Sequence, residues 1–168
     1  MKTIGRLGAA WGAAGVLALL VFAVVRLAPK VREAYVLGLD RTHWIALIGF
    51  AAFMAYSEGY RGFQLRFSPR TAARVRYLRD RPSLLRSALG PLFAMGFFHA
   101  NPRTLIVAYA LTAMVVTLVV AIQWLAQPWR GIIDAGVVLG LSWGIVSLVA
   151  SLSAALRQAE YAVSPEID

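Results

Sequence analysis

The chain contains no cysteine. Disulfide bonds, thiolate metal sites and cysteine nucleophiles are therefore excluded, and redox chemistry gives no indication of the compartment. Charged residues are also scarce, at 15%, against roughly 25% in soluble domains. The uncharged residues are gathered into long apolar runs, which a soluble core of this size has no room to bury.

Acidic residues are the scarcer of the charged kinds, with 8 against 17 basic residues and a formal net charge of +9. Nearly all of the basic residues are arginines that flank apolar runs. The phosphates of a bilayer surface explain such a pattern better than nucleic acid does. Lys2 and Arg6 precede an apolar stretch that has no clear cleavage site, so we interpret it as a retained span rather than a signal peptide.

The apolar runs predict an all-α polytopic membrane protein with a single integral membrane domain over residues 1–168 and spans at about 7–28, 43–63, 104–126 and 132–155. We expect Pro29 to end the first span and Asp40 or Thr42 to cap the second. The second apolar run is short, so this span must continue through Glu58 and Arg61 to cross.

An arginine-rich loop over residues 64–103 separates the second and third spans. Ser68 and Pro69 are typical of a helix start, and Pro82 should end that helix. Its arginines recur at four-residue spacing beside a narrow apolar face, which predicts an interfacial helix against anionic headgroups. The predicted lipid- or partner-binding residues are Arg66, Arg70, Arg74, Arg76, Arg79 and Arg81.

The segment 84–99 has an apolar core that is short for a span, and it can be interfacial, re-entrant or a fifth span. The positive-inside rule places the arginine-rich loop in the cytoplasm, and with four spans both termini lie there too.

Polar residues within the spans allow several roles. A polar pocket is predicted from Glu58, Tyr60, Arg61, His99 and Asn101, all expected on the cytoplasmic side. Arg130 and Asp134 are predicted to pair at the start of the fourth span; this is a structural role, with a proton or ion role as the alternative. The repeat of Gly136, Gly140 and Gly144 predicts close helix packing, within one chain rather than between copies.

His43 and His99 are expected far apart, which argues against a haem between them. We predict no metal site, no cofactor and no catalytic residue set.

Three stretches resemble a group of short inner-membrane proteins from proteobacteria: SEGYRGFQLRFSPR at 57–70, PLFAMGFFHANPR, and QPWRGIIDAGVVLGLSWG. The resemblance covers roughly residues 50–145. No activity is established for that group, so the resemblance implies a bacterial inner-membrane setting and carries no site residue across.

The function predicted first is that of a membrane-embedded binding or accessory protein. Its arginine-rich loop would engage anionic phospholipid or an acidic partner, alone, as a homo-oligomer or in a larger membrane complex, with no role for nucleic acid. The first alternative is a small oligomeric transporter or channel with Asp134 or Glu58 in its path. The second is an enzyme acting on a lipid phosphate, with Glu58 or His99 as acid or base.

Overall fold

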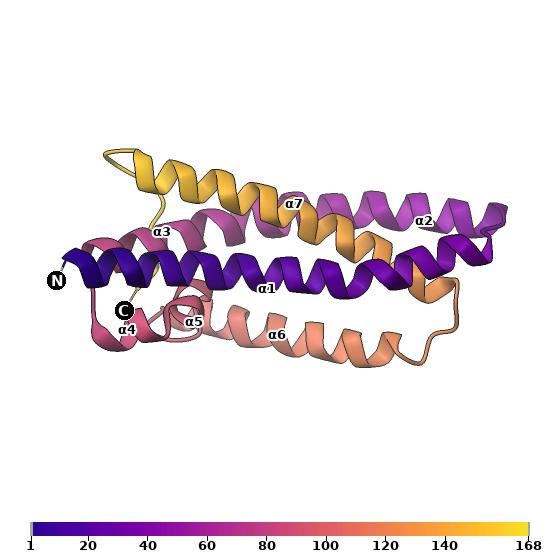
Figure 1. Ribbon diagram of the computed structural model, residues 1–168, viewed down its shortest axis with the longest axis horizontal. Helices are drawn as coiled ribbons and strands as arrows, with labels where there is room; N and C mark the ends of the chain where they lie inside the picture. The colour runs from indigo at the N-terminus through magenta and orange to yellow at the C-terminus, as the bar shows by residue number, and fades with distance from the viewer. Residues whose placement is uncertain (1, 168) are drawn as a thin grey trace.

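The computed structural model describes residues 2–167, with side chains from Thr3, and this part of the chain is helical without strands. The elements are α1 (Lys2–Leu37), α2 (Arg41–Met54), the π-helix η1 (Ala55–Phe67), α3 (Ser68–Asp80), α4 (Leu84–Ala88), α5 (Gly90–Met95), α6 (Pro102–Ile122) and α7 (Trp129–Arg157). Figure 1 shows them as an elongated bundle with long helices running along its axis.

Three helices in the described chain are long and apolar enough to cross a membrane: α1 over Thr3–Leu37, α6 and α7. They agree with the first, third and fourth predicted spans. The second predicted span is not among them, because the apolar helix α2 has 14 residues and η1 continues it with polar residues.

The first span is longer than predicted, because Pro29 lies inside α1 instead of ending it. Proline removes one backbone donor and normally kinks or ends a helix. Here residues outside α1 stabilise the turn after Pro29. Gln127 Nε2 donates to Lys30 O at 3.2 Å, and Ala34 is buried against Gly131 of α7. Contacts with α7 therefore override the local signal.

The turn between α1 and α2 follows the prediction. Gly38 has a φ of +87°, which a glycine adopts without steric cost. The Asp40 carboxylate then accepts from His43 N at 2.9 Å and caps α2. Two antiparallel helices result, α1 and the continuous rod formed by α2, η1 and α3 (Figure 1).

Ser68 does not cap a new helix, contrary to the prediction. Its φ of −63° and ψ of −46° are helical, so α3 continues η1 without a break. The Ser68 hydroxyl instead lies 2.9 Å from the Ser147 hydroxyl of α7. The predicted end before Pro82 is confirmed, because α3 stops at Asp80.

The glycine repeat of α7 packs within the chain. A Cβ built on Gly136 would meet Phe50, one on Gly140 would meet Glu58, and one on Gly144 would meet Phe63, each at less than 3 Å. All three partners lie on α2 or η1. Glycine therefore sets the close approach of α7 to the rod.

A second glycine face lies on α1, where Gly8, Gly12 and Gly15 lie against Ser87, Gly90 and Pro91. The segment 84–99 therefore packs along the first half of α1 and returns to the same end. With α4 at five residues and α5 at six, it does not form a fifth span. Pro91 reaches the level of Gly15, inside the predicted first span.

Candidate functional site

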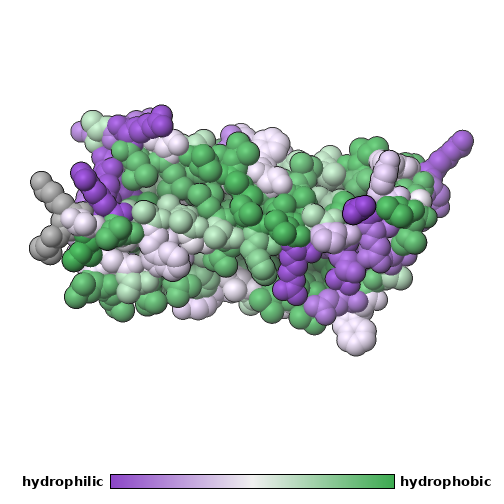
Figure 2. Space-filling view, in the orientation of Figure 1, coloured by the Kyte–Doolittle hydropathy of each residue, from purple (hydrophilic) through white to green (hydrophobic). Residues whose placement is uncertain are grey.

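One end of the bundle collects most of the positive charge. We call it the basic end; it holds the start of α1, the end of η1, the helices α3, α4 and α5, the start of α6 and the end of α7 (Figure 1). Figure 2 shows apolar side chains over much of the visible face and hydrophilic ones gathered toward its ends. Five of the six predicted binding arginines fall into three groups at this end, and Arg70 stands apart from them.

Arg74 is the first group and is fully buried, at 0% exposure. Its guanidinium lies 4.3 Å from the Phe93 ring centre and donates to five backbone carbonyls, those of Phe93, Phe98, His99, Pro165 and Glu166. Burial, and then the nearby charge of Arg70, lowers the pKa of Arg74 to about 10, so the side chain stays charged at neutral pH. Arg74 thus joins α3, the 93–99 segment and residues 165–166.

Arg76 and Arg79 form the second group and cap α7. Arg76 Nη1 donates to Ala155 O at 3.0 Å and Gln158 O at 2.9 Å, and Arg79 Nη1 donates to Leu156 O at 3.1 Å. The last carbonyls of a helix lack partners within the helix, and cations there also meet a favourable dipole. These two guanidinium groups are therefore directed at the protein itself.

The apolar face of α3 explains this inward arrangement. Ala72, Val75 and Leu78 are each 0% exposed and are enclosed by other helices. A helix lying flat on a bilayer would turn such a face toward lipid. The structure instead encloses α3 between α1 and α7, so this face packs against protein and the interfacial placement predicted for the helix is not confirmed.

Arg66 and Arg81 form the third group and are exposed. Three arginines that the prediction did not include are exposed at the same end, on α1, α6 and α7. The exposed set, which we call the arginine rim, is Arg6, Arg66, Arg81, Arg103 and Arg157. The spacing of arginines along α3 could not predict the arginine rim, because its members come from four separate segments of the chain.

Arg70 stands between these groups and faces the only carboxylate of the 160–167 segment that enters the basic end. Its Nη1 lies 3.8 Å from Glu166 Oε2, with side chains 17% and 40% exposed. The Thr104 hydroxyl donates to the same Glu166 oxygen, and Asn101 N donates to Glu166 O at 3.1 Å. Asn101 Oδ1 caps α6 by accepting from Thr104 N at 2.9 Å.

The predicted polar pocket does not form as a unit. Glu58 packs against Gly140 of α7. His99 is instead bound by Arg74, which follows Glu58 by sixteen residues in the same rod. At about 1.5 Å or less per residue, Glu58 and Arg74 are roughly 20 Å apart along the rod. Tyr60 and Arg61 are exposed, and Asn101 belongs to the start of α6. The pocket fails because the 84–99 segment packs along α1 rather than over η1.

The Arg130–Asp134 pair is present. Arg130 Nε lies 3.8 Å from Asp134 Oδ2, and the Asp134 side chain is 3% exposed. Neither of these two atoms has a hydrogen-bond partner in the described chain. The pair lies at the end opposite the basic end, as does His43, which contacts Trp129 with ring centres 4.8 Å apart. His43 and His99 therefore lie far apart, as predicted.

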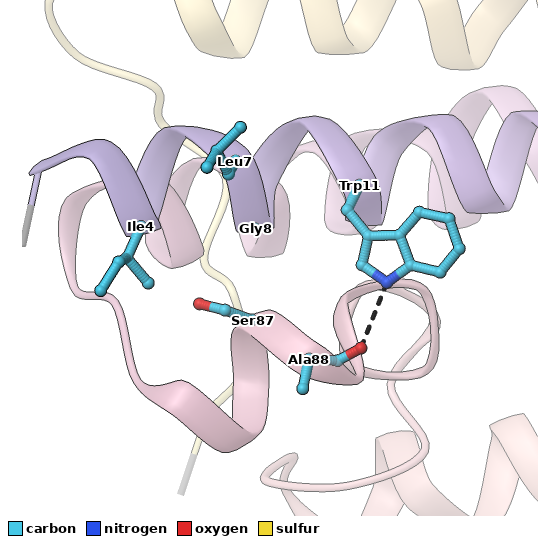
Figure 3. A pocket seen from close by; sticks show the side chains of 6 residues that line it. All are labelled: Ile4, Leu7, Gly8, Trp11, Ser87 and Ala88. Atoms are coloured by element: carbon cyan, nitrogen blue, oxygen red, sulfur yellow. Dashed lines mark hydrogen bonds between the residues drawn. The ribbon is translucent and has the colours of Figure 1, made fainter.

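A shallow recess of about 360 Å³ opens at the basic end. Figure 3 shows it between α1 and α4, lined by Ile4, Leu7, Gly8, Trp11, Ser87 and Ala88. The Trp11 indole donates to Ala88 O at 3.2 Å, and the buried Ser87 hydroxyl has no partner among the described residues. The recess is an apolar groove with the buried Ser87 hydroxyl in its wall, and its lining residue Leu7 directly follows Arg6 of the rim.

Metal binding finds no support in the described part of the chain, where no three His, Asp or Glu side chains gather. The chain matches no protein-family model, no curated protein and no solved structure. The resemblance seen in the sequence therefore stays a prediction, and function has to be argued from the basic end itself.

Proposed function

We propose that the protein is a four-span binding or accessory protein of a bacterial inner membrane that engages anionic phospholipid through the arginine rim. The observation that carries the proposal is the exposure of five arginines from four segments around one end of an apolar bundle. Each basic residue near an anionic surface contributes about 1 kcal/mol of attraction. The apolar recess beside Arg6 supports the proposal, since a bound lipid needs apolar surface next to its phosphate contacts.

The charge distribution supports an orientation with the basic end in the cytoplasm. At the opposite end lie five basic residues, Arg26, Lys30, Arg32, Arg41 and Arg130, together with the acidic residues Glu33, Asp40 and Asp134. The other basic residues, 12 of the 17, belong to the basic end or to η1. The positive-inside rule assigns the more basic side to the cytoplasm. Both ends of the described chain lie at that side (Figure 1).

The fourth crossing in this proposal is made by α2 together with η1. These two elements pack along α7 from Phe50 beside Gly136 to Phe63 beside Gly144. If α7 crosses the bilayer, the parts of the rod at the same level cross with it. Arg61 and Arg66 are long enough to extend from such a span toward the headgroups.

Native mass spectrometry of the full chain tests the proposal. We expect protein extracted from membranes that contain phosphatidylglycerol and phosphatidylcholine to retain phosphatidylglycerol preferentially. A triple variant with Arg66, Arg81 and Arg103 each replaced by Gln should lose most of this preference. The matched control replaces Arg26, Arg32 and Arg41, exposed arginines of the other end, and should keep it. Equal losses in both variants would mean that net charge rather than the arginine rim holds the lipid.

A second candidate function, a small transporter, is favoured by Glu58 alone. Its carboxylate lies against Gly140, midway along the contact between η1 and α7, and its Oε2 atom is buried without a hydrogen-bond partner in the described chain. A carboxylate at membrane depth is costly, so it usually has a structural partner or a transport role. A proton role predicts that the wild type carries protons into liposomes under a potential and that Glu58→Gln does not. Absence of proton flux in the wild type would remove this candidate.

A further inference from the structure

The residues 160–167 form an irregular segment that crosses the basic end and is held there by polar contacts. Tyr161 donates to Pro69 O at 3.4 Å, Arg74 Nη1 donates to Pro165 O at 3.0 Å, and the Glu166 carboxylate accepts from Thr104. Between these anchors, Ala162, Val163 and Ser164 are exposed. Tyr161 also packs against the hydrophobic core, whereas Pro165 and Glu166 are held by polar contacts. A competitor for these polar contacts can therefore displace the part of the segment that follows Tyr161.

The cluster that receives Glu166 has more positive charge than this one carboxylate balances. Arg70 and Arg86 lie close enough to Arg74 for each to lower its pKa, and among the described residues Glu166 is the one acidic group that opposes them. The Nε atoms of Arg70 and Arg86 are buried and have no hydrogen-bond partner in the described chain. At 3.8 Å, the contact between Arg70 and Glu166 is longer than a hydrogen bond.

The backbone conformation of Glu166 is also unfavourable. Its φ is +50°, a left-handed conformation that is uncommon for residues other than glycine and that costs free energy. A phosphate has more acceptor oxygens than a carboxylate and pairs well with guanidinium groups. The site is reachable, because the Glu166 side chain is 40% exposed.

We propose that the 160–167 segment is a displaceable plug and that the phosphate of an anionic lipid headgroup replaces the Glu166 carboxylate between Arg70 and Thr104. The inference rests on the proposed lipid-binding function and adds regulation to it. In the plugged state Glu166 occupies the site as an internal substitute for the ligand. In the open state the headgroup takes these contacts, and the segment is released from the bundle.

A single spin label tests the exchange in the full chain. The protein has no native cysteine, so Val163→Cys places one label on an exposed position of the segment. We expect a restricted label in phosphatidylcholine nanodiscs and a larger mobile fraction in an equal mixture of phosphatidylcholine and phosphatidylglycerol. A third sample adds inorganic phosphate to the phosphatidylcholine nanodiscs. Release there would support the exchange of phosphate for carboxylate but overturn the lipid as its source.

Charge variants complete the test. Glu166→Gln should free the label even in phosphatidylcholine and raise retention of phosphatidylglycerol on the order of threefold to tenfold, because the internal competitor is weakened. Glu160→Gln removes the same charge from an exposed residue of the same segment and should change neither readout. Circular dichroism of both variants checks that the helices are intact.

The outcomes separate the plug from the proposed function. A label that stays restricted in the mixture, while native mass spectrometry shows retained phosphatidylglycerol, would overturn the plug and leave the lipid-binding function in place. A wild type that retains no phosphatidylglycerol would overturn the function itself. Unchanged lipid retention in Glu166→Gln, with the label freed, would show that the segment leaves without exposing a binding site.

Discussion

The helices α6 and α7 are both long and apolar enough to cross a membrane, yet they are placed very differently. In the most apolar stretch of α7, 39% of the residues are buried, against 11% in that of α6. Helix α7 carries a glycine at every fourth position of one face, and each admits a side chain of the rod. Helix α6 contains no glycine, and its buried residues are Thr104 and Ala108, both in its first two turns. Small residues, rather than apolar character, therefore decide which span enters the bundle.

The two helices also differ in how they are attached. Helix α7 is in contact along its length, whereas α6 is joined at its start through Asn101, Thr104 and the Tyr109 hydroxyl, which donates to Phe97 O at 3.2 Å. Arg74 binds the carbonyls of Phe98 and His99, directly before this start. The attachment of α6 thus combines the contacts of its own first turns with one buried guanidinium that holds the segment before it.

The largest effect is expected from Arg74→Met, which removes the group that holds the start of α6. The substitution keeps an unbranched side chain but removes a donor from five carbonyls. Those of Phe93 and Glu166 still accept from backbone N–H groups, whereas those of Phe98, His99 and Pro165 lose their donor. Each buried unsatisfied group costs about 1–3 kcal/mol. We expect a loss of several kcal/mol in the free energy of unfolding, measured in detergent with a denaturant. Hydrogen exchange should rise first in residues 93–104. Arg74→Lys keeps the charge but lacks the planar fork of donors, so it should rescue only part of the loss.

A smaller loss is expected from Gly144→Leu, which introduces a bulky side chain where the Phe63 ring lies within 3 Å of the position that a Cβ would take. Overpacking of this kind costs about 1–3 kcal/mol. The matched change on the exposed helix is Ala113→Leu, which adds a similar side chain to a position facing outward on α6. Thermal unfolding in detergent should shift for the first variant and stay nearly constant for the second. Equal shifts would mean that α6 is packed as tightly as α7.

The smallest effect is expected from Asp134→Asn, which tests a second difference between α7 and α6, their content of ionisable residues. Helix α7 carries this buried carboxylate, whereas α6 has no ionisable residue after Arg103 except Tyr109. The ion pair with Arg130 spans 3.8 Å without a hydrogen bond, so neutralising Asp134 removes a weak attraction along with a desolvation cost. Stability should change by less than about 1 kcal/mol. A loss of activity in a stable Asn variant would instead indicate an ion or proton role.

The sequence was most informative where the signal is local. The apolar runs predicted α6 and α7 to within a few residues, and Asp40 was named as a cap of α2 because a short acceptor beside a helix start acts over three residues. The same local reasoning was wrong at Pro29 and Ser68. Each of these positions lies beside a contact with a segment distant in sequence. Ser68 contacts α7, and the residue after Pro29 is bound by the turn before α7. These contacts decide the local conformation.

The candidate site was harder to predict than the fold. Helical spacing predicts Arg66, Arg70 and Arg74 on one face, but it does not show what each side chain meets, and the three have different surroundings: Arg66 is exposed, Arg70 is half-buried and Arg74 is fully buried. Arg74 meets carbonyls from residues 93–99 and 165–166, which no pattern in the sequence brings together. The rim and the contact of Glu166 with Thr104 were missed for the same reason, because their members come from segments that are distant along the chain.

The unbroken passage from α2 through η1 to α3 has a mechanical consequence. From Arg41 to Asp80 the chain forms one rod with no loop inside it, and at about 1.5 Å per residue it is roughly 60 Å long, about twice the thickness of the hydrocarbon layer. All three of its elements pack against α7, so the rod and α7 behave as one stiff pair. A displacement of α3 therefore reaches α2, at the far end of the bundle, only when α7 moves with it.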